Sequence, residues 1–457
     1  MILTNTLTKQ KEELTAKSGE KIKMFVCGPT VYDYIHIGNA RTFVFFDIVA
    51  KYLKHKGYQV DYIQNITDID NKIIERATKE GMDSLEYAKK YTEIFKQDML
   101  ALGVTSPEYK NATDHIPEVI KQVQTLLDKN NAYVIQNDGI YFDLSTFPDY
   151  GKLSGRTAEM ADDAVSRIDD SNKKRNRGDF ALWKFSQAGD PSWPAPFGDG
   201  RPGWHIEDTA ITERYFGPQY DIHGGGQDLM FPHHEAEIAQ QESASGLKPF
   251  VKYWLHVAFL ITKEAKMSKS LGNFETAHEL LKKYSPEAIR FYLLSAHHKT
   301  PLDFDEKLLN QSAAAVRRIK EFADKLSLAN GQAKVCADID ATESKFYSSL
   351  DDDFNTAAAF GSLFELIGKV NPLIVSNELN KTCAQKISKL LSGADEMLGI
   401  IPKKEEKIPE EVTRLIEERE KYRQDKNFAE ADKIRSQIES LGYKIEDTIY
   451  GPLAIKN

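Results

Sequence analysis

The hydrophobic and polar positions near the start of the chain predict a strand, a turn and a helix. Residues 21–26 (KIKMFV) form a short apolar run with β-branched and aromatic members, and Cys27-Gly28-Pro29 ends it as a turn ends a strand. After Gly38, apolar residues recur at helical spacing as far as Leu53, and Gly57 stands where a helix C-cap belongs. The pattern therefore predicts a strand over 21–26 and a helix that begins near residues 38–41.

The hydrophobic spacing becomes helical throughout from about residue 308. One stripe consists of Val316, Ile319, Phe322 and Leu326. Asp351-Asp352-Asp353 is suited to a helix N-terminus, where negative charge is stabilised. A Lys/Glu-rich stretch near 402–410 is typical of a linker, and the charged tail after it ends in a strand-like segment.

The whole pattern predicts an α/β fold, in which a Rossmann-type parallel-sheet catalytic domain carries an insertion and precedes an all-α bundle and a small C-terminal appendage. A chain of 457 residues is too long for one ordinary domain. A Pro/Gly-rich stretch from Gly189 to Gly203 ends the predicted insertion. The expected boundaries are 1–115 and 201–307 for the two halves of the catalytic domain, 116–200 for the insertion, 308–401 for the bundle and 402–457 for the appendage.

Composition narrows the possible classes of protein. A content of 41% apolar residues is enough for sizeable cores, and we expect neither a membrane span nor a signal peptide. The three cysteines, Cys27, Cys336 and Cys383, are odd in number and far apart, so no disulfide framework is indicated and a cytoplasmic location is expected. A net charge of -9 argues against a broadly basic surface. A nucleic-acid partner would therefore need local patches, for which 173–177, 317–320 and the C-terminal tail are candidates, although each is also typical of solvated surface.

The tetrapeptide His36-Ile37-Gly38-Asn39 lies at the predicted start of the first helix. The free N–H groups there favour an anion, and Gly38 has no Cβ to keep a nucleotide away. His36 and Asn39 can each donate a hydrogen bond to phosphate oxygens. A plain chain turn is the alternative interpretation for this tetrapeptide alone.

A second motif, Lys266-Met267-Ser268-Lys269-Ser270, carries two ammonium groups on a predicted loop. Such a loop can close on a reacting phosphate and stabilise departing pyrophosphate in the transition state. A solvated Lys/Ser loop is the alternative. The two motifs together resemble the two signatures of the class I aminoacyl-tRNA synthetases, with Asn39 where the first signature often ends in a second histidine. That substitution keeps a hydrogen-bonding group at the position.

A thiol and two polar side chains could form a metal site near the first motif. Cys27 lies at the predicted strand end, where parallel-sheet proteins bind their ligands. Pro232 is a good first-turn residue, so His233 and Glu237 would share one helical face at i and i+4. Together they form a plausible zinc set. Taken singly, Cys27 is more typical of a buried apolar residue and the His/Glu pair of a surface polar pair.

Several longer runs resemble the cysteine–tRNA ligase family over nearly the whole chain. They are residues 24–33, 65–72, 201–207, 221–225 and 231–235. The resemblance implies zinc in the amino-acid pocket, held by Cys27, His233 and Glu237. The position after Glu207 is usually a second cysteine in that family, and here it is Asp208. Aspartate carries the same single charge but is a harder ligand, so we expect zinc with Asp208 as an oxygen ligand and keep a weak or absent metal as the alternative.

The same resemblance implies ATP-dependent attachment of L-cysteine to tRNA(Cys) through a cysteinyl adenylate, with Mg²⁺ assisting and the protein acting as a monomer without a membrane. It implies catalytic roles for His36, Asn39, Lys266 and Lys269 and ATP binding by Gly28, His36, Gly38, Asn39 and Lys269. It implies substrate binding by Cys27, Thr67, Trp204 and His223. Two alternatives stay open: a ligase that passes the cysteinyl group to a small amine, and a noncatalytic RNA-binding relative.

Overall fold

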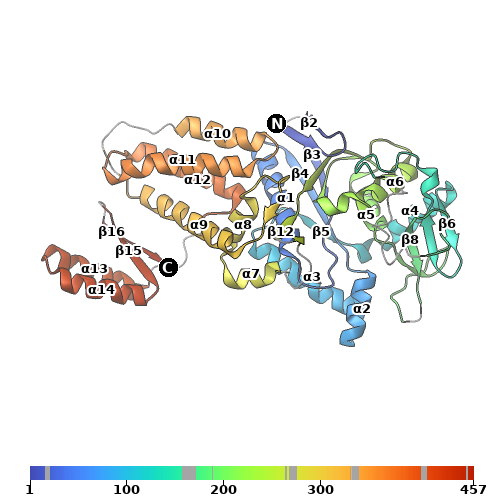
Figure 1. The fold of residues 1–457 in the computed structure, drawn as a ribbon, viewed down its shortest axis with the longest axis horizontal. Helices are drawn as coiled ribbons and strands as arrows, with labels where there is room; N and C mark the ends of the chain where they lie inside the picture. Colours follow the sequence, from blue (N-terminus) through green and yellow to red (C-terminus); the bar gives the residue numbers. More distant parts are fainter. Residues whose placement is uncertain are drawn as a thin grey trace.

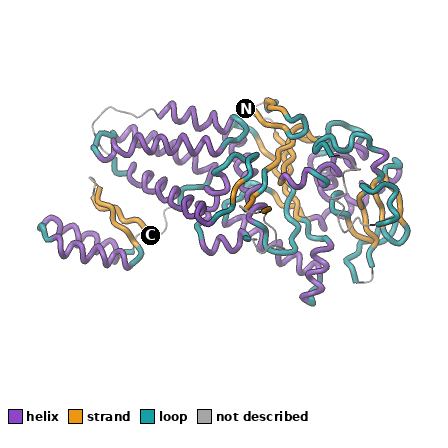
Figure 2. Tube along the Cα trace, in the orientation of Figure 1, coloured by secondary structure: helices purple, strands orange, loops and turns teal. Residues whose placement is uncertain are grey.

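The computed structural model describes residues 1–15, 21–156, 171–187, 189–262, 265–266, 275–329, 331, 339–402, 409–448 and 451–456. A central α/β body joins an insertion at one end and a helical bundle at the other, with the C-terminal appendage beyond the bundle (Figure 1). Figure 2 shows the same division, with the strands gathered in the body and the insertion and with mostly helices in the bundle. The predicted α/β fold with a parallel sheet and a C-terminal helical region is confirmed.

The central sheet has five parallel strands in the order β11-β10-β3-β4-β5. Their bounds are β3 Lys21–Val26, β4 Gln59–Ile66, β5 Glu108–Asn111, β10 Tyr220–Gly226 and β11 Val251–Val257. The predicted strand over 21–26 is confirmed as β3. Strands β4 and β5 follow β3 on one side of the sheet, and β10 and β11 are added later on the other side. The carboxyl ends of β3 and β10 therefore lie at the point where the strand order reverses, which is where such sheets bind ligands.

The two faces of the sheet pack into different cores because successive side chains of a strand point to opposite faces. Met24 belongs to the core shared with α1 (Ile37–His55), while Phe25 belongs to the core shared with the insertion. The helix predicted to begin near 38–41 begins at Ile37, and Gly57 follows its end with a positive φ of 89°. Helices α2 Asn71–Glu80, α3 Ser84–Ala101, α5 Ile206–Phe216 and α6 His233–Ser245 complete this body.

The insertion contains a second, antiparallel sheet in the order β6-β7-β8-β9. Its elements are α4 Ile116–Asp128, β6 Ala132–Ile135, β7 Gly139–Phe142, β8 Phe180–Phe185 and β9 Gly200–Pro202. The turn at 151–154 is fixed to α6 because the buried Glu235 carboxylate accepts backbone N–H groups from Gly151 (3.1 Å), Leu153 (2.8 Å) and Ser154 (2.6 Å). The insertion is thereby attached to the helix that carries the predicted ligands His233 and Glu237.

A small three-stranded sheet follows the central sheet and leads into the bundle. It consists of β12 Leu260–Thr262, β13 Ala265–Lys266 and β14 Leu302–Asp303, with α7 Ala277–Lys283 and α8 Pro286–Leu294. The backbone of Lys266 pairs with that of Ile261. Lys269 and the rest of 267–274 lie outside the described residues.

The bundle contains α9 Glu306–Leu326, α10 Ile339–Asp351, α11 Thr356–Val375 and α12 Lys381–Leu398. The stripe predicted on α9 is buried as expected. The Asp351–Asp353 prediction was wrong: Asp351 ends α10, and α11 begins at Thr356 with Asn355 as its cap. Cys383 on α12 is disulfide-bonded, which also differs from the expectation, while Cys27 is a free buried thiol.

Helix α11 is relevant to the expectation that the chain has no membrane span. Its 20 residues have a mean hydropathy of 1.3 and would be long and apolar enough to cross a membrane by length and composition. Buried core helices pass the same test, so the expected absence of a membrane span stays a prediction. In the structure Leu363, Leu366, Ile367 and Val370 of this helix are buried in the core that joins the bundle to α1.

The appendage has its own small core. Helices α13 Glu410–Gln424 and α14 Phe428–Ser440 pack against the hairpin of β15 Tyr443–Thr448 and β16 Gly451–Lys456. Among the described residues, this core consists of the buried side chains of Val412, Leu415, Ile434, Ile438 and Ile445. The strand-like end predicted for the tail is therefore confirmed.

Candidate active site and metal centre

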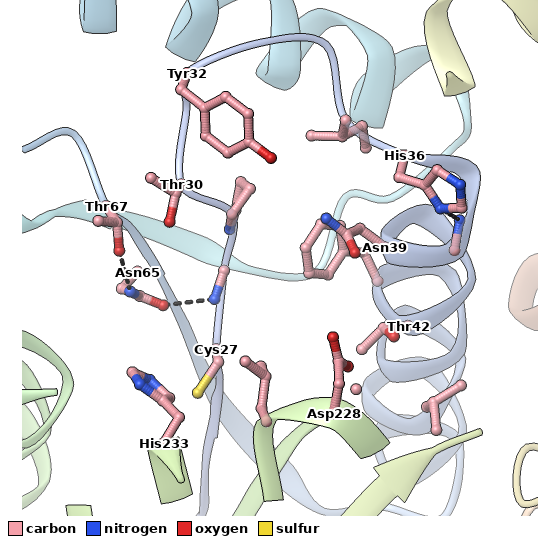
Figure 3. A pocket seen from close by; sticks show the side chains of 18 of the residues that line it. Cys27, Thr30, Tyr32, His36, Asn39, Thr42, Asn65, Thr67, Asp228 and His233 are labelled. Atoms are coloured by element: carbon pink, nitrogen blue, oxygen red, sulfur yellow. Dashed lines mark hydrogen bonds between the residues drawn. The ribbon is translucent and has the colours of Figure 1, made fainter. Parts of the chain in front are cut away.

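A cavity of about 360 Å³ opens at the switch point of the sheet. Cys27 and His233 lie at one end of it and His36 at the other, where α1 begins (Figure 3). Gly28, Gly38, Asn39, Thr67, Trp204 and Asp208 also line it. The predicted ATP motif and the predicted thiol-binding residues therefore face one cavity, although more than 160 positions separate Asn39 from Trp204 in the sequence.

The start of α1 is fixed by the side chain of His36. This residue is the N-cap, and its Nδ1 accepts a hydrogen bond from the backbone N–H of Gly38 (2.9 Å). That bond places the proton of a neutral ring on Nε2. A Cβ at Gly38 would lie 2.8 Å from His36 Nδ1, so a larger residue would disturb this cap. The N–H groups of the first turn and the exposed Asn39 then form the anion-favouring end of the helix.

The loop after β3 is held against the end of β4. Asn65 Oδ1 accepts the backbone N–H of Gly28 (2.6 Å), and Asn65 Nδ2 donates to Thr67 Oγ1 (3.3 Å). Thr67 Oγ1 in turn donates to the buried carboxylate of Glu207. A Cβ at Gly28 would lie 1.7 Å from Asn65 O, so only glycine fits this close approach. Asn65, in a run quoted for the family resemblance, is a site residue that we did not single out from the sequence.

The predicted metal ligands come together around the sulfur of Cys27. Its Sγ lies 3.3 Å from Asp208 Oδ2 and 3.6 Å from Glu237 Oε1. His233 Nε2 lies 2.9 Å from Asp208 Oδ2 and 3.2 Å from Glu237 Oε1. All four side chains are buried, and their ligand atoms lie within 4.8 Å of one another. The expected set of Cys27, Asp208, His233 and Glu237 is thus arranged as a candidate metal centre.

A second group overlaps the first and includes a histidine that we did not single out. Cys27 and Glu237 also form a group with His223 and His234, whose Nε2 atoms lie 3.3 Å and 3.1 Å from the sulfur. The sequence did contain a signal, because His233 and His234 are adjacent at the start of α6. His223 does not line the cavity. Its Nδ1 lies 2.6 Å from Tyr220 Oη, and its ring stacks on Trp254.

The electrostatics of this cluster favour a cation. Burial raises the pKa of the Cys27 thiol well above its usual range, and the carboxyls of Glu237 and Asp208 raise it further. Burial also raises the pKa of Glu237 and lowers the pKa of His234, so the imidazole stays neutral. Asp208 Oδ1 is buried and accepts no hydrogen bond from the described residues. A bound cation would relieve each of these penalties, so the donor set fits a metal ion.

Models of three known protein families match successive segments of the chain. They are the "tRNA synthetases class I (C) catalytic domain" at residues 13–314, the "DALR domain" at 345–402 and the "Cysteinyl-tRNA ligase anticodon binding domain" at 405–448. The cysteine–tRNA ligase of Caldicellulosiruptor saccharolyticus is 44% identical over 463 residues, which cover 99% of this chain and 98% of that protein. The chain belongs to the cysteine–tRNA ligase family.

Other members of the cysteine–tRNA ligase family are similar over the same length. The enzyme of Carboxydothermus hydrogenoformans is 44% identical, with 99% of both chains covered. Among solved structures, a Mycobacterium tuberculosis methionyl-tRNA synthetase in complex with methionyl-adenylate has a TM-score of 0.62 at 15% identity and covers 83% of this chain and 89% of its own. At that identity the likeness concerns the fold alone, and it agrees with the parallel sheet described above.

Proposed function

We propose that this protein attaches L-cysteine to tRNA(Cys) with ATP through a cysteinyl-adenylate intermediate. The observation that carries the proposal is the shared cavity, in which the cap of α1 at His36 faces the same space as the cluster around Cys27. One end is suited to phosphate and the other to a thiol-binding cation. Membership of the cysteine–tRNA ligase family supports the same activity.

Zinc is the metal proposed for the cluster, with Cys27, Asp208, His233 and Glu237 as ligands. When bound, it would supply selective binding of the substrate thiol, since zinc holds a thiolate far better than a neutral hydroxyl. A hydrophobic pocket alone separates cysteine from serine poorly. A ten-thousandfold preference needs about 5.5 kcal/mol of differential free energy. Trp204 packs on His233 with ring centroids 4.5 Å apart, and it lines the cavity together with the buried Thr67.

The chain's own residues have defined roles in the proposed reaction. The carboxylate of cysteine attacks the α-phosphorus of ATP, the bond to pyrophosphate breaks, and the cysteinyl adenylate forms. His36, through Nε2–H, Asn39 and the start of α1 stabilise the phosphate charge beside Gly28 and Gly38. Lys266 and Lys269, with Mg²⁺ bound to the nucleotide, assist the departure of pyrophosphate. The terminal ribose hydroxyl of the tRNA then attacks the carbonyl carbon and releases AMP.

The tRNA contacts are proposed for the C-terminal parts of the chain. The proposed division is 1–115 and 201–307 for the catalytic domain, 116–200 for the insertion, and 308–401 and 402–457 for the anticodon-side bundle and appendage. The matches to the DALR and anticodon-binding patterns support this assignment. A monomeric state, which sedimentation would test, and a cytoplasmic location stay predictions.

A charging assay with metal analysis tests the proposal. We expect cysteine-dependent exchange of pyrophosphate into ATP, transfer of cysteine to tRNA(Cys), and one zinc per chain. Exchange without transfer to tRNA would favour a ligase that uses a small amine, and the absence of both would favour an RNA-binding protein. Cysteine activation at full rate in a protein without zinc would refute the metal assignment alone.

A further inference from the structure

The N-terminal hairpin is fixed against both the bundle and the central sheet. It consists of β1 (Ile2–Asn5) and β2 (Gln10–Glu13). Thr4 donates from its backbone N and its hydroxyl to the carboxylate of Asp353, at 2.7 and 2.6 Å. Asn5 Oδ1 accepts the backbone N–H of Trp254 (3.0 Å), and Thr6 N donates to Trp254 O (2.8 Å). The turn that begins at Thr6 is therefore held along β11, close behind the metal cluster.

A continuous line of hydrogen bonds joins Thr6 to the sulfur of Cys27. Thr6 Oγ1 lies 2.9 Å from His256 Nδ1, His256 Nε2 lies 2.8 Å from His234 Nδ1, and His234 Nε2 lies 3.1 Å from Cys27 Sγ. Both imidazoles are buried, and both ring nitrogens of each imidazole have a hydrogen-bond partner along this line. A neutral imidazole carries a single N–H, on one of its two ring nitrogens.

In a line of hydrogen bonds through neutral imidazoles, all the donated protons point toward one end or all point toward the other. We call this direction the polarity of the relay, and the group at either end can determine it. If the Thr6 hydroxyl donates, His256 donates from Nε2 and His234 also donates from Nε2, toward the sulfur. If the Thr6 hydroxyl accepts, every proton moves to the opposite ring nitrogen, and His234 presents a lone pair. The first polarity makes His234 a hydrogen-bond donor to Cys27, and the second makes it a metal ligand in the overlapping group with His223.

We propose that Thr6 is a positioning residue that donates to His256 and thereby holds His234 as an N–H donor to the Cys27 thiolate. This inference rests on the proposed function and its metal site. One observation favours this polarity. Asp208, His233 and Glu237 already complete a four-ligand set with Cys27, so His234 is not needed as a ligand.

The polarity has a physical consequence for the thiolate. A buried sulfur that carries negative charge is stabilised by a hydrogen bond, and outer partners of this kind fix the orientation of a metal ligand and alter its affinity for the metal. Thr6 thus connects the N-terminal hairpin to Cys27, a proposed ligand of the zinc ion that would bind the substrate thiol. The same hairpin contacts the bundle through Asp353. Removal of its hydroxyl leaves His256 Nδ1 without this donor and lets the relay reverse.

Three variants test the role of the hydroxyl. Thr6→Val keeps the shape and removes the hydroxyl, Thr6→Ser keeps the hydroxyl, and Thr8→Val removes an exposed hydroxyl from the same turn, where it contacts Glu12. For Thr6→Val we expect about tenfold weaker zinc binding in chelator competition, a higher KM for cysteine in pyrophosphate exchange, and an unchanged KM for ATP. Thr6→Ser and Thr8→Val should behave as the unaltered protein. Unchanged zinc affinity in a folded Thr6→Val protein would overturn the proposal.

Nitrogen NMR of the full chain labelled in histidine provides a direct test of the polarity. In the zinc-loaded protein we expect His234 and His256 to carry their protons on Nε2, and we expect this pattern to be lost in Thr6→Val. A metal-bound His234 Nε2, or a proton on His234 Nδ1, would overturn the proposal. Failure of the proposed function would be seen separately, as the absence of cysteine-dependent exchange in the unaltered protein, because the affinity and NMR measurements do not require activity.

Discussion

The backbones of His36 and Thr276 form an antiparallel bridge. Ile37 N donates to Glu275 O (3.1 Å), and Ala277 N donates to Ile35 O (3.1 Å). The chain therefore returns from residues 267–274 directly beside the cap of α1. Lys266 on β13 is the described residue before that stretch, and Thr276 lies directly beside the cap of α1 at the proposed phosphate site.

Lys269→Ala should lower the rate of cysteine-dependent pyrophosphate exchange by about a hundredfold or more, because one charge that stabilises the transition state is lost. The KM for cysteine should change little, since the thiol end of the cavity is untouched. Steady-state exchange kinetics measure both quantities. Lys282→Ala is the matched control, as Lys282 is an exposed lysine on α7 paired with Glu279 (2.7 Å). An exchange rate that stays normal in Lys269→Ala would refute the role of Lys269.

The side chain at position 208 should determine how tightly the site binds zinc and how strongly the bound zinc prefers a thiolate to an oxygen ligand. Asp208→Asn removes a charged ligand, and we expect zinc to bind more than about tenfold more weakly. Asp208→Cys replaces the oxygen by a thiolate, so zinc should bind more tightly and serine should be rejected more strongly than in the unaltered protein. Chelator competition and exchange with each amino acid measure the two effects. Asp149→Asn, at an exposed carboxylate, is the control, and equal zinc affinity in Asp208→Asn and the control would contradict the ligand role.

Zinc binding should depend on pH in a definite direction. The pKa values of Cys27 and Glu237 are raised by burial, so without a cation Cys27 holds its proton at neutral pH and Glu237 binds a proton more readily than an ordinary carboxyl group does. The metal binds the deprotonated forms, so each binding event releases protons and the affinity falls as the pH is lowered. Calorimetry in two buffers of different ionisation enthalpy counts the released protons. A heat of binding that is identical in both buffers would show that no proton leaves.

Arg290 should be a large contributor to stability, because it joins α8 to α1 and α12 without access to water. Its guanidinium donates to Leu398 O (2.7 Å) and Leu102 O (2.8 Å) and lies 3.3 Å from Asp47 Oδ2. Arg290→Met leaves a buried carboxylate with one fewer partner, and we expect a loss of about 3–5 kcal/mol in the free energy of unfolding. Urea unfolding followed by circular dichroism measures it. Lys282→Met should cost less than about 0.5 kcal/mol, and an equal cost for the two variants would contradict the prediction.

Local patterns in the sequence determined much of the fold. The strand at 21–26, the helix after Gly38 and the stripe on α9 were all predicted, because burial of one face imposes a period that the sequence displays directly. The error at Asp351–Asp353 has a cause that lies far away in the sequence. Negative charge favours the start of a helix, but here Asp353 accepts two hydrogen bonds from Thr4, which is 349 positions away in the sequence.

For the candidate site, the residues that could bind phosphate and metal could be identified without a structure, since donor type and helical spacing are local properties of the sequence. It placed Cys27, His233 and Glu237 in one set, and the structure gathers them with Asp208. The folded chain was needed to show that His234 and His223 both face the sulfur, and that Thr6 contacts the same cluster through His256. These relationships depend on how β1, β10, β11 and α6 pack together. Contacts between side chains so distant in the sequence leave no periodic signal in a single chain.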